Sequence, residues 1–380
     1  MQLMRSVFLL AVAVASLHTS LHAAVLPEDR ADVLYHRYNG GGMEIQGPSV
    51  LVRKGVAGRV SLSANYYVDK VSSASVDVVT TASPYREERK EKSVGMDYLA
   101  GKAIYSLGYT TSVENDYDAK AFNFGASQDF FGDLTTLSFG YARGDDTVRR
   151  TGDALFEEAA MRQHFRFGIT QVITKNMLMS LSHEFISDEG FLNNPYRSVR
   201  YVDSAQAKGY GYQSEIYPNT RTSEATALRA GYYLPWQSAV HAEYRRFADS
   251  WGIDASDWGL DYIHPLKNGV ELEVNYRQYS QTAADFYADL FPFQNAQNFL
   301  ARDKEMSKFN SNSYGVAVNW DFFKERTKYI DRLGFRIAID RYSFRYDNFR
   351  DLRVSVPVPG TEPLYAFKAT VTQLLFTAWY

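Results

Sequence analysis

The sequence predicts an all-β fold, namely a transmembrane, antiparallel, up-and-down β-barrel of about sixteen strands with both termini on the periplasmic side. Three observations predict it. The chain begins with an export signal, its apolar and polar residues alternate in segments about ten residues long, and the links between these segments are short and long in turn.

The export signal occupies residues 1–23. Arg5 precedes an apolar run, and the small residues Ala23 and Ala24 follow it, which is the pattern of a secretory signal peptide. A membrane anchor would need about 18 or more consecutive apolar residues, and this run is shorter. We therefore expect residues 24–380 to form a single β-barrel domain in the outer membrane of a Gram-negative bacterium.

Each predicted strand has one apolar face and one polar face. Val270 and Leu272, for example, alternate with Glu271 and Glu273. About ten residues suffice to cross a bilayer as a tilted strand. The sixteen segments are 32–39, 43–54, 59–69, 93–100, 103–112, 120–127, 135–144, 161–173, 177–188, 224–233, 238–249, 256–263, 269–281, 312–322, 333–346 and 364–380.

The links favour a membrane barrel over a soluble fold. Short turns at one end and long loops at the other are typical of outer-membrane barrels. A soluble sandwich or propeller has shorter strands and needs no export signal. Fourteen or eighteen strands remain open, because the first segment and the loop 189–223 are ambiguous. The long links are 70–92, 145–160, 189–223, 282–311 and 347–363.

The last segment indicates how the chain is assembled. Leu374, Phe376 and Tyr380 share one face, and the chain stops on an aromatic residue, as outer-membrane barrels commonly do for their assembly machinery. We expect the partners to be outer-membrane lipid and the barrel-assembly machinery, which would recognise the strand that ends at Tyr380.

Composition excludes several kinds of function. The 380 residues carry 41 Lys+Arg against 44 Asp+Glu, a formal net charge of −3, so we expect no nucleic-acid partner. The absence of cysteine excludes disulfide scaffolds, thiolate metal centres and cysteine nucleophiles. No cofactor motif occurs, and no histidine pair has metal-ligand spacing.

The polar faces of the strands predict a lumen with charges of both signs. A charge on the lipid face costs about 2–4 kcal/mol at the midplane, so charged residues belong inside. They could act on a permeating solute, or they could pair with one another in a structural network; for most single residues we favour the structural role. The lumen-lining candidates are His241, Glu243, Arg245, Asp257, Asp261, Glu271, Glu273, Arg277, Arg336 and Asp340.

Two charged loop segments have weaker functional signals. Residues 114–118 could supply oxygen ligands to calcium, but they lack the spacing of a dedicated loop, and we expect a solvated turn. The run from 86 to 92 is expected to form an exposed, charged loop end. His183 lies near Ser182 and Glu184, but alternation directs it to the opposite face, so we expect no catalytic triad and no enzyme.

Several stretches together resemble a family of Gram-negative outer-membrane proteins catalogued only as a domain of unknown function. The resemblance spans nearly the whole mature chain and implies a β-barrel of no assigned activity, sometimes encoded near exported thioredoxin-like and flavin-transferase proteins. Periplasmic partner proteins are an expectation from it. The stretches are SANYYVDKVSSASVDVVTTASPYREER (63–89), GFLNNPYRSVRY (190–201), YPNTRTSEA (217–225), YYLPW (232–236), YRRFADSWGI (244–253) and YRQYSQTAADFYAD (276–289).

These stretches also indicate a site at the long-loop rim. A loop as long as 189–223 with no helix pattern suggests a functional loop. We hypothesise that it folds into the mouth and forms a constriction; an ordinary packed external loop is the alternative. The rim candidates are Arg197, Arg200, Arg221, Asp249, Trp251, Gln281, Asp285 and Tyr287.

Function is therefore expected to depend on the lumen. The leading expectation is a porin-like channel for small polar solutes with a mixed-charge lumen. The alternative is a non-conducting barrel scaffold that partners an exported redox or maturation complex. The identity of the solute cannot be read from the sequence.

Overall fold

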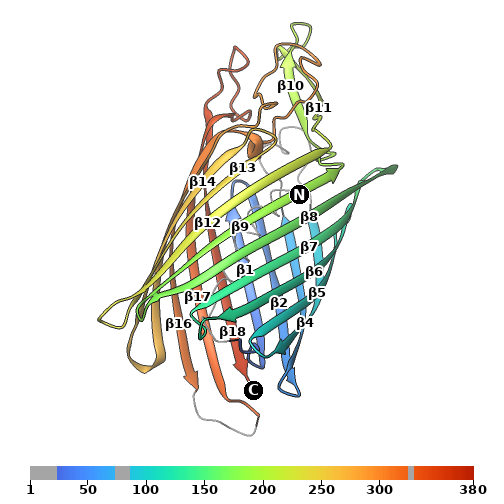
Figure 1. Ribbon diagram of the computed structural model, residues 1–380. Helices are drawn as coiled ribbons and strands as arrows, with labels where there is room; N and C mark the ends of the chain where they lie inside the picture. The colour runs from blue at the N-terminus through green and yellow to red at the C-terminus, as the bar shows by residue number, and fades with distance from the viewer. Residues whose placement is uncertain (1–23, 73–85, 324–328) are drawn as a thin grey trace.

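The alternating segments form sixteen antiparallel strands that close into one barrel (Figure 1). The computed structural model describes residues 24–72, 86–323 and 329–380. Neighbouring strands pair in chain order, except that β12 pairs with β9, and β1 pairs with β18 to close the barrel. This confirms the predicted fold and the strand number of sixteen.

Thirteen of the sixteen barrel strands are longer than the predicted segments, and β13, β15 and β18 are one residue shorter. The sixteen strands are β1 (Arg30–Gly40), β2 (Met43–Val56), β3 (Val60–Ser72), β4 (Arg86–Ala100), β5 (Ala103–Val113), β6 (Tyr117–Phe130), β7 (Thr135–Arg150), β8 (Asp153–Thr174), β9 (Met177–Gly190), β12 (Thr220–Tyr233), β13 (Ala239–Asp249), β14 (Asp254–Pro265), β15 (Val270–Gln281), β16 (Phe309–Phe323), β17 (Arg332–Arg350) and β18 (Leu364–Trp379).

Outside the barrel strands, most of the described chain is irregular. A hairpin of β10 (Ser198–Val202) and β11 (Tyr210–Ser214) rises above the rim at the upper end (Figure 1). Two short 3₁₀ helices, η1 (Lys267–Gly269) and η2 (Lys304–Met306), lie in links between strands. No helix in the described part of the chain is long and apolar enough to cross a membrane.

The strand register separates an outer apolar face from an inner polar face. In β14 and β15, Leu260 faces Tyr276, and Asp261 faces Asn275 on the other side of the sheet. Leu260 and Val274 are 50% and 43% exposed, as expected of side chains that point away from the barrel. Period-two alternation thus produces both faces.

The described ends of the chain meet at the short-turn end of the barrel. The C-terminus lies opposite the β10–β11 hairpin (Figure 1). The amide of Tyr380 donates to the carbonyl of Asp29 at 3.2 Å, and the amide of Ala24 donates to Asp129 Oδ2 at 2.7 Å. The predicted signal peptide, residues 1–23, lies outside the described residues.

Two loop predictions are wrong because charged strands extend beyond the apolar belt. Residues 145–160 are not a loop, since β7 and β8 run through them and only 151–152 intervene. Arg149 stabilises this extension through Asp118 Oδ2 at 2.7 Å and Glu157 Oε2 at 3.0 Å. Likewise 86–92 is part of β4, and cross-strand ion pairs replace the apolar alternation that marks a strand in sequence.

Candidate functional site

All ten lumen-lining candidates lie on the inner face of β13, β14, β15 and β17. The register shows this, because residues directly opposite one another share a face. Their roles in transport stay a prediction. The shared inner face follows from register pairs such as His241 with Asp261, Arg245 with Asp257, Glu273 with Ala317 and Ala317 with Ala338. Asp340 lies on the same face because it follows Ala338 by two residues.

Arginines on the inner face are paired with carboxylates of nearby strands. Arg277 Nε donates to Asp257 Oδ1 at 2.7 Å, and Arg336 Nη1 donates to Glu273 Oε2 at 2.5 Å. The partners lie on adjacent strands in the first pair and two strands apart in the second. These ion pairs therefore follow the wall.

A second set of inner-face charges was missed in the sequence. Glu184 of β9 lies 3.2 Å from Arg245 Nη2, 3.7 Å from Arg166 Nε and 3.7 Å from His164 Nε2. Arg229 of β12 donates to Glu243 Oε1 at 3.3 Å. The parity of β8, β9 and β12 could have identified these residues, since each has a small residue beside it on the same face: Gly168 for Arg166, Ser182 for Glu184 and Ala227 for Arg229.

Together, the lumen candidates and this second set of charges divide the inner wall into two sectors of different charge. On β14, β15 and β17, five of the lumen candidates are carboxylates (Asp257, Asp261, Glu271, Glu273 and Asp340) and two are arginines, Arg277 and Arg336. On β8, β9, β12 and β13 the balance shifts toward arginine through Arg162, Arg166, Arg229 and Arg245. A solute in the lumen would meet an acidic side and a more basic side.

A glycine makes room for one polar contact in the acidic sector. Gly315 lies in register with both Asn275 and Asp340. A Cβ at this position would lie only 1.9 Å from Asp340 Oδ1. Without that atom, Asn275 Nδ2 donates to Asp340 Oδ1 at 3.1 Å across β16.

At the loop end of the barrel, three of the rim candidates form one cluster. Arg221 Nε donates to Asp249 Oδ2 at 2.8 Å. The Arg221 guanidinium lies 4.6 Å from the centre of the Trp251 ring, a cation–π contact. Asp249 Oδ1 also accepts from the amides of Trp251 and Ile253, both at 2.9 Å, and so fixes the β13–β14 turn.

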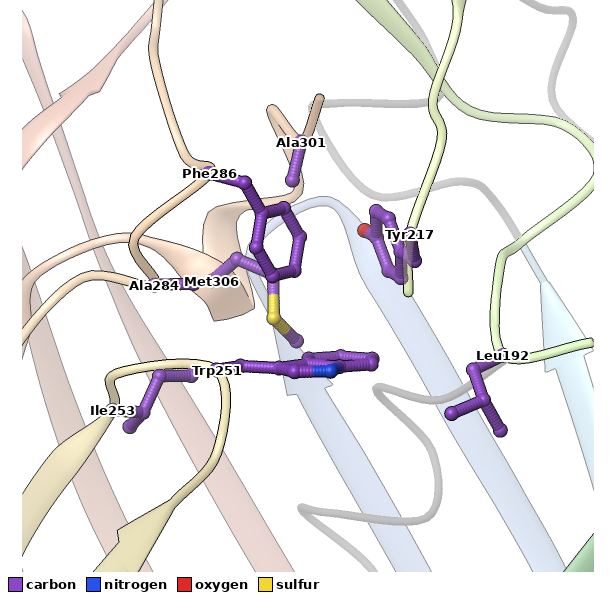
Figure 2. Packing of buried hydrophobic residues seen from close by; sticks show 8 residues of the cluster. All are labelled: Leu192, Tyr217, Trp251, Ile253, Ala284, Phe286, Ala301 and Met306. Carbon is purple, nitrogen blue, oxygen red and sulfur yellow. The ribbon is translucent and has the colours of Figure 1, made fainter. Parts of the chain in front are cut away.

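Trp251 is the base of an apolar cluster at the mouth (Figure 2). Its ring lies edge-on to Tyr217 and Phe286, with ring centres 5.4 Å and 5.3 Å away. Leu192 and Met306 complete the contacts from two other links. Three links between barrel strands, 191–219, 250–253 and 282–308, therefore pack together; with 351–363 we name them the cap.

Buried ion pairs hold the outer part of the cap. Arg200 of β10 is fully buried and donates to Glu362 at 2.5 Å and to the carbonyl of Asp289 at 2.9 Å. Burial opposes its charge, but these acceptors hold the pKa of Arg200 above its ordinary value. Arg302 Nη2 reaches Asp289 Oδ1 at 2.9 Å, and Arg197 pairs with Asp303.

The remaining rim candidates contact partners that the sequence did not suggest. Gln281 Nε2 donates to the carbonyls of Glu305 and Ser307, both at 2.8 Å. Tyr287 OH donates to the carbonyl of Asn348 at 3.0 Å. The amide of Asp285 donates to the carbonyl of Trp251 at 2.8 Å. These bonds tie the link 282–308 to β15, to β17 and to the β13–β14 turn.

One group of carboxylates in the described ranges could hold a metal ion. Oxygens of Glu87, Glu114 and Asp116 lie within 4.8 Å of one another. The expected solvated turn at 114–118 is wrong at Asp116, which is only 6% exposed and accepts a hydrogen bond from Tyr196 OH. Calcium takes six to eight oxygens, so three carboxylates alone do not define a site, and we assign no ion.

A pocket of mixed charge lies beside these residues. It is bounded by the inner wall of β4–β9 and by residues 191–195 of the cap. Arginine donors and carboxylate acceptors both border it, which suits a polar ligand. Among its lining residues are Arg89, Arg162, Glu114, Asp146 and Asp188.

The register also separates the residues considered for catalysis. His183 faces Thr226, and its Nδ1 lies 3.0 Å from Thr226 Oγ1. Ser182 and Glu184 face Ala227 and Ala225 on the other side of the sheet. The three cannot act together.

The closed strand order, the apolar outer face and the charged interior define a β-barrel of the outer-membrane type. Residues 72–331 match the family described as protein of unknown function (DUF3570). Because the match covers more than half of the sequence, the chain belongs to this family, as the resemblance in the sequence implies. No match was found among curated proteins.

Solved structures with a similar chain path are outer-membrane proteins of low sequence identity. A bacterial polysaccharide outer membrane secretin aligns with a TM-score of 0.49 and 6% identity, over 93% of this chain and 100% of that chain. OpdK of Pseudomonas aeruginosa, solved with vanillate, gives 0.43 and 11%, over 94% and 100%. The CymD monoaromatic hydrocarbon channel gives 0.43 and 9%, over 93% and 89%.

Proposed function

We propose that the protein is an outer-membrane channel for small polar solutes. In this proposal residues 1–23 direct export and are removed, and the barrel-assembly machinery inserts residues 24–380 into the outer membrane of a Gram-negative bacterium. The exposed apolar outer face supports insertion into lipid.

The observation that carries the proposal is the direction of the inner ion pairs. Arg277–Asp257 and Arg229–Glu243 join adjacent strands, and Arg336–Glu273 and Arg245–Glu184 reach two strands. Strands lie about 4.8 Å apart, so these contacts span at most about 10 Å along the wall. Barrels of sixteen strands are wide enough for an aqueous channel, and pairs along the wall do not fill it.

The arrangement of charge favours polar solutes. An acidic sector on β14–β17 adjoins the more basic sector on β8–β13, and both face the lumen. Charges of both signs replace part of the hydration of a polar solute. No catalytic step is part of this proposal.

Planar-bilayer current through refolded residues 24–380 tests the proposal. The current is compared in two salts that share one ion, either potassium or chloride, and differ in the size of the counterion. We expect stable current steps that are smaller in the salt with the bulkier ion. Silence from protein with the gel mobility of a folded barrel would overturn the channel.

The packed cap favours a second candidate function, a non-conducting scaffold for exported partner proteins. Trp251, Tyr217 and Phe286 bury apolar surface between the cap links at the mouth. A barrel whose mouth is closed by its loops would need the same packing. This candidate predicts silence in bilayers together with capture of periplasmic proteins on immobilised barrel. An open channel that captures none of them would contradict it.

A further inference from the structure

The outer wall of β17 and β18 carries three exposed cations near the loop end. Arg341 and Arg345 lie on the outward face of β17, and Lys368 lies on the outward face of β18. Lys368 is paired in register with Ser343, midway between the two arginines. We name these three residues the basic patch.

The spacing allows the patch to contact one ligand. A strand rises about 3.3 Å per residue, so the Cα atoms of the arginines lie about 13 Å apart. The Cα of Lys368 lies diagonally about 7–8 Å from each, and all three side chains are long. Asn310 faces Arg345, and Tyr314 faces Arg341, so further hydrogen-bond donors border the patch.

None of the three cations makes an ion pair with a residue in the described ranges. Two other cations of the outer wall do: Arg37 lies 2.7 Å from Glu44, and Arg246 lies 3.6 Å from Asp254. The carboxylate of Asp347 follows Arg345 by two residues, but it lies 3.3 Å from Lys308 Nζ. The patch therefore keeps its positive charge.

The patch lies directly above the apolar belt. Ile339 precedes Arg341 by two residues and faces Val316, and the two side chains are 49% and 50% exposed. A lipid-facing charge is costly at the midplane and nearly free at the interface. The register thus places the patch at headgroup level, on the side of the long loops.

We propose that Arg341, Arg345 and Lys368 bind the phosphate groups of a lipid in the leaflet on the long-loop side. Guanidinium groups bind phosphate through paired hydrogen bonds, and lipid is what an outward strand face contacts in a membrane. The inference rests on the membrane location in the proposed function. It does not depend on whether the lumen conducts.

Native mass spectrometry of the refolded barrel in detergent micelles tests the inference. The micelles contain lipid A, which has two phosphates, or its dephosphorylated form. The test variant is R341Q/R345Q/K368Q, and the matched control is R246Q, which removes an outer-wall cation that is already paired. We expect the test variant to lose about 100-fold in affinity for lipid A, because each cation near an anionic headgroup contributes roughly fivefold, and R246Q to bind like the unchanged chain.

Three results would overturn the inference: equal lipid A binding by the test variant and the unchanged chain, equal binding of the dephosphorylated lipid, or displacement of lipid A by millimolar inorganic phosphate, which would indicate a site for the free ion. If the triple variant fails to fold, R341K/R345K is measured instead, and it should retain partial binding. Lipid binding is measured by mass spectrometry, whereas the channel proposal is tested by bilayer current. A failure of one proposal can therefore be distinguished from a failure of the other.

Discussion

Single buried charges determine how firmly the cap is held. Arg200 has no exposed surface and two acidic partners, Glu362 and Asp289. In R200M Glu362 would lose its cation, while Asp289 would keep Arg302. Breaking a buried pair in this way costs about 3–5 kcal/mol. We expect the free energy of cap opening to fall by this amount, measured by hydrogen exchange at the amides of Val202 and Ile216, which bond to other cap links.

The matched control for R200M is R353Q. Arg353 donates to Asp351 at 2.8 Å, but its side chain is 51% exposed, and such pairs contribute about 0–1 kcal/mol. Faster exchange in R353Q than in R200M would contradict the account of the cap.

The cap should loosen in acid. Burial favours the neutral form of Glu362, but hydrogen bonds from Arg200 and from backbone amides hold its pKa below the ordinary value of 4.5. A carboxylate with a lowered pKa in the folded state contributes stability above its unfolded pKa, and this contribution is lost as the pH falls through the folded pKa. Cap amides should therefore exchange faster below about pH 4.5, after correction for intrinsic rates. The same slope in E362Q would contradict this assignment.

A single lumen charge should change ion selectivity. In R336Q, Glu273 loses the donor at 2.5 Å, and the acidic sector gains negative charge. One charge at about 4 Å is worth about 1 kcal/mol in water, so we expect the permeability ratio of cations to anions to rise by up to about fivefold. The reversal potential in a salt gradient measures it, with R246Q on the outer wall as the control; equal values for R336Q and the unchanged chain would refute a role for this residue.

At the scale of elements, alternation predicted the strands wherever one face is apolar. The prediction failed where strands extend above the lipid. Both faces of a strand are polar there, so apolar and polar residues no longer alternate. β7 and β8 show this between 145 and 160, where Arg149, Asp118 and Glu157 pair across strands. The β10–β11 hairpin was missed for a related reason, since it packs on other loops and not on the lumen.

The candidate site was predictable to a similar extent. Alternation along the strand was enough to place the inner charges of β13, β14, β15 and β17. Once a strand and one outward apolar residue are known, every second residue from that one faces out and the others face in. The cap could not be predicted in detail. Arg200 and Glu362 are 162 positions apart, and no local pattern connects them. The motif at 244–253 did indicate Asp249 and Trp251, because the bonds of Asp249 to Arg221, Trp251 and Ile253 lie within the β13–β14 turn and the adjoining strand β12.

For the whole molecule, two features bear on function: ion pairs that follow the wall and a cap that covers the mouth. Ion pairs along the wall leave the lumen open to ions, whereas a cap over the mouth would reduce the current. Removing part of the cap separates the two effects. The amide of Gly190 donates to the carbonyl of Asn219 at 2.8 Å, so the ends of this link lie together, and residues 191–194 can join them after deletion of 195–218.

The most direct test compares the single-channel conductance of the full mature chain with that of the 195–218 deletion in the same salt. The deletion removes Arg197, Arg200 and Tyr217, which bind the other cap links. We predict current steps from both proteins and a larger conductance from the deletion. Equal conductance would contradict the role of the cap as a constriction, and silence from both folded proteins would contradict the channel itself.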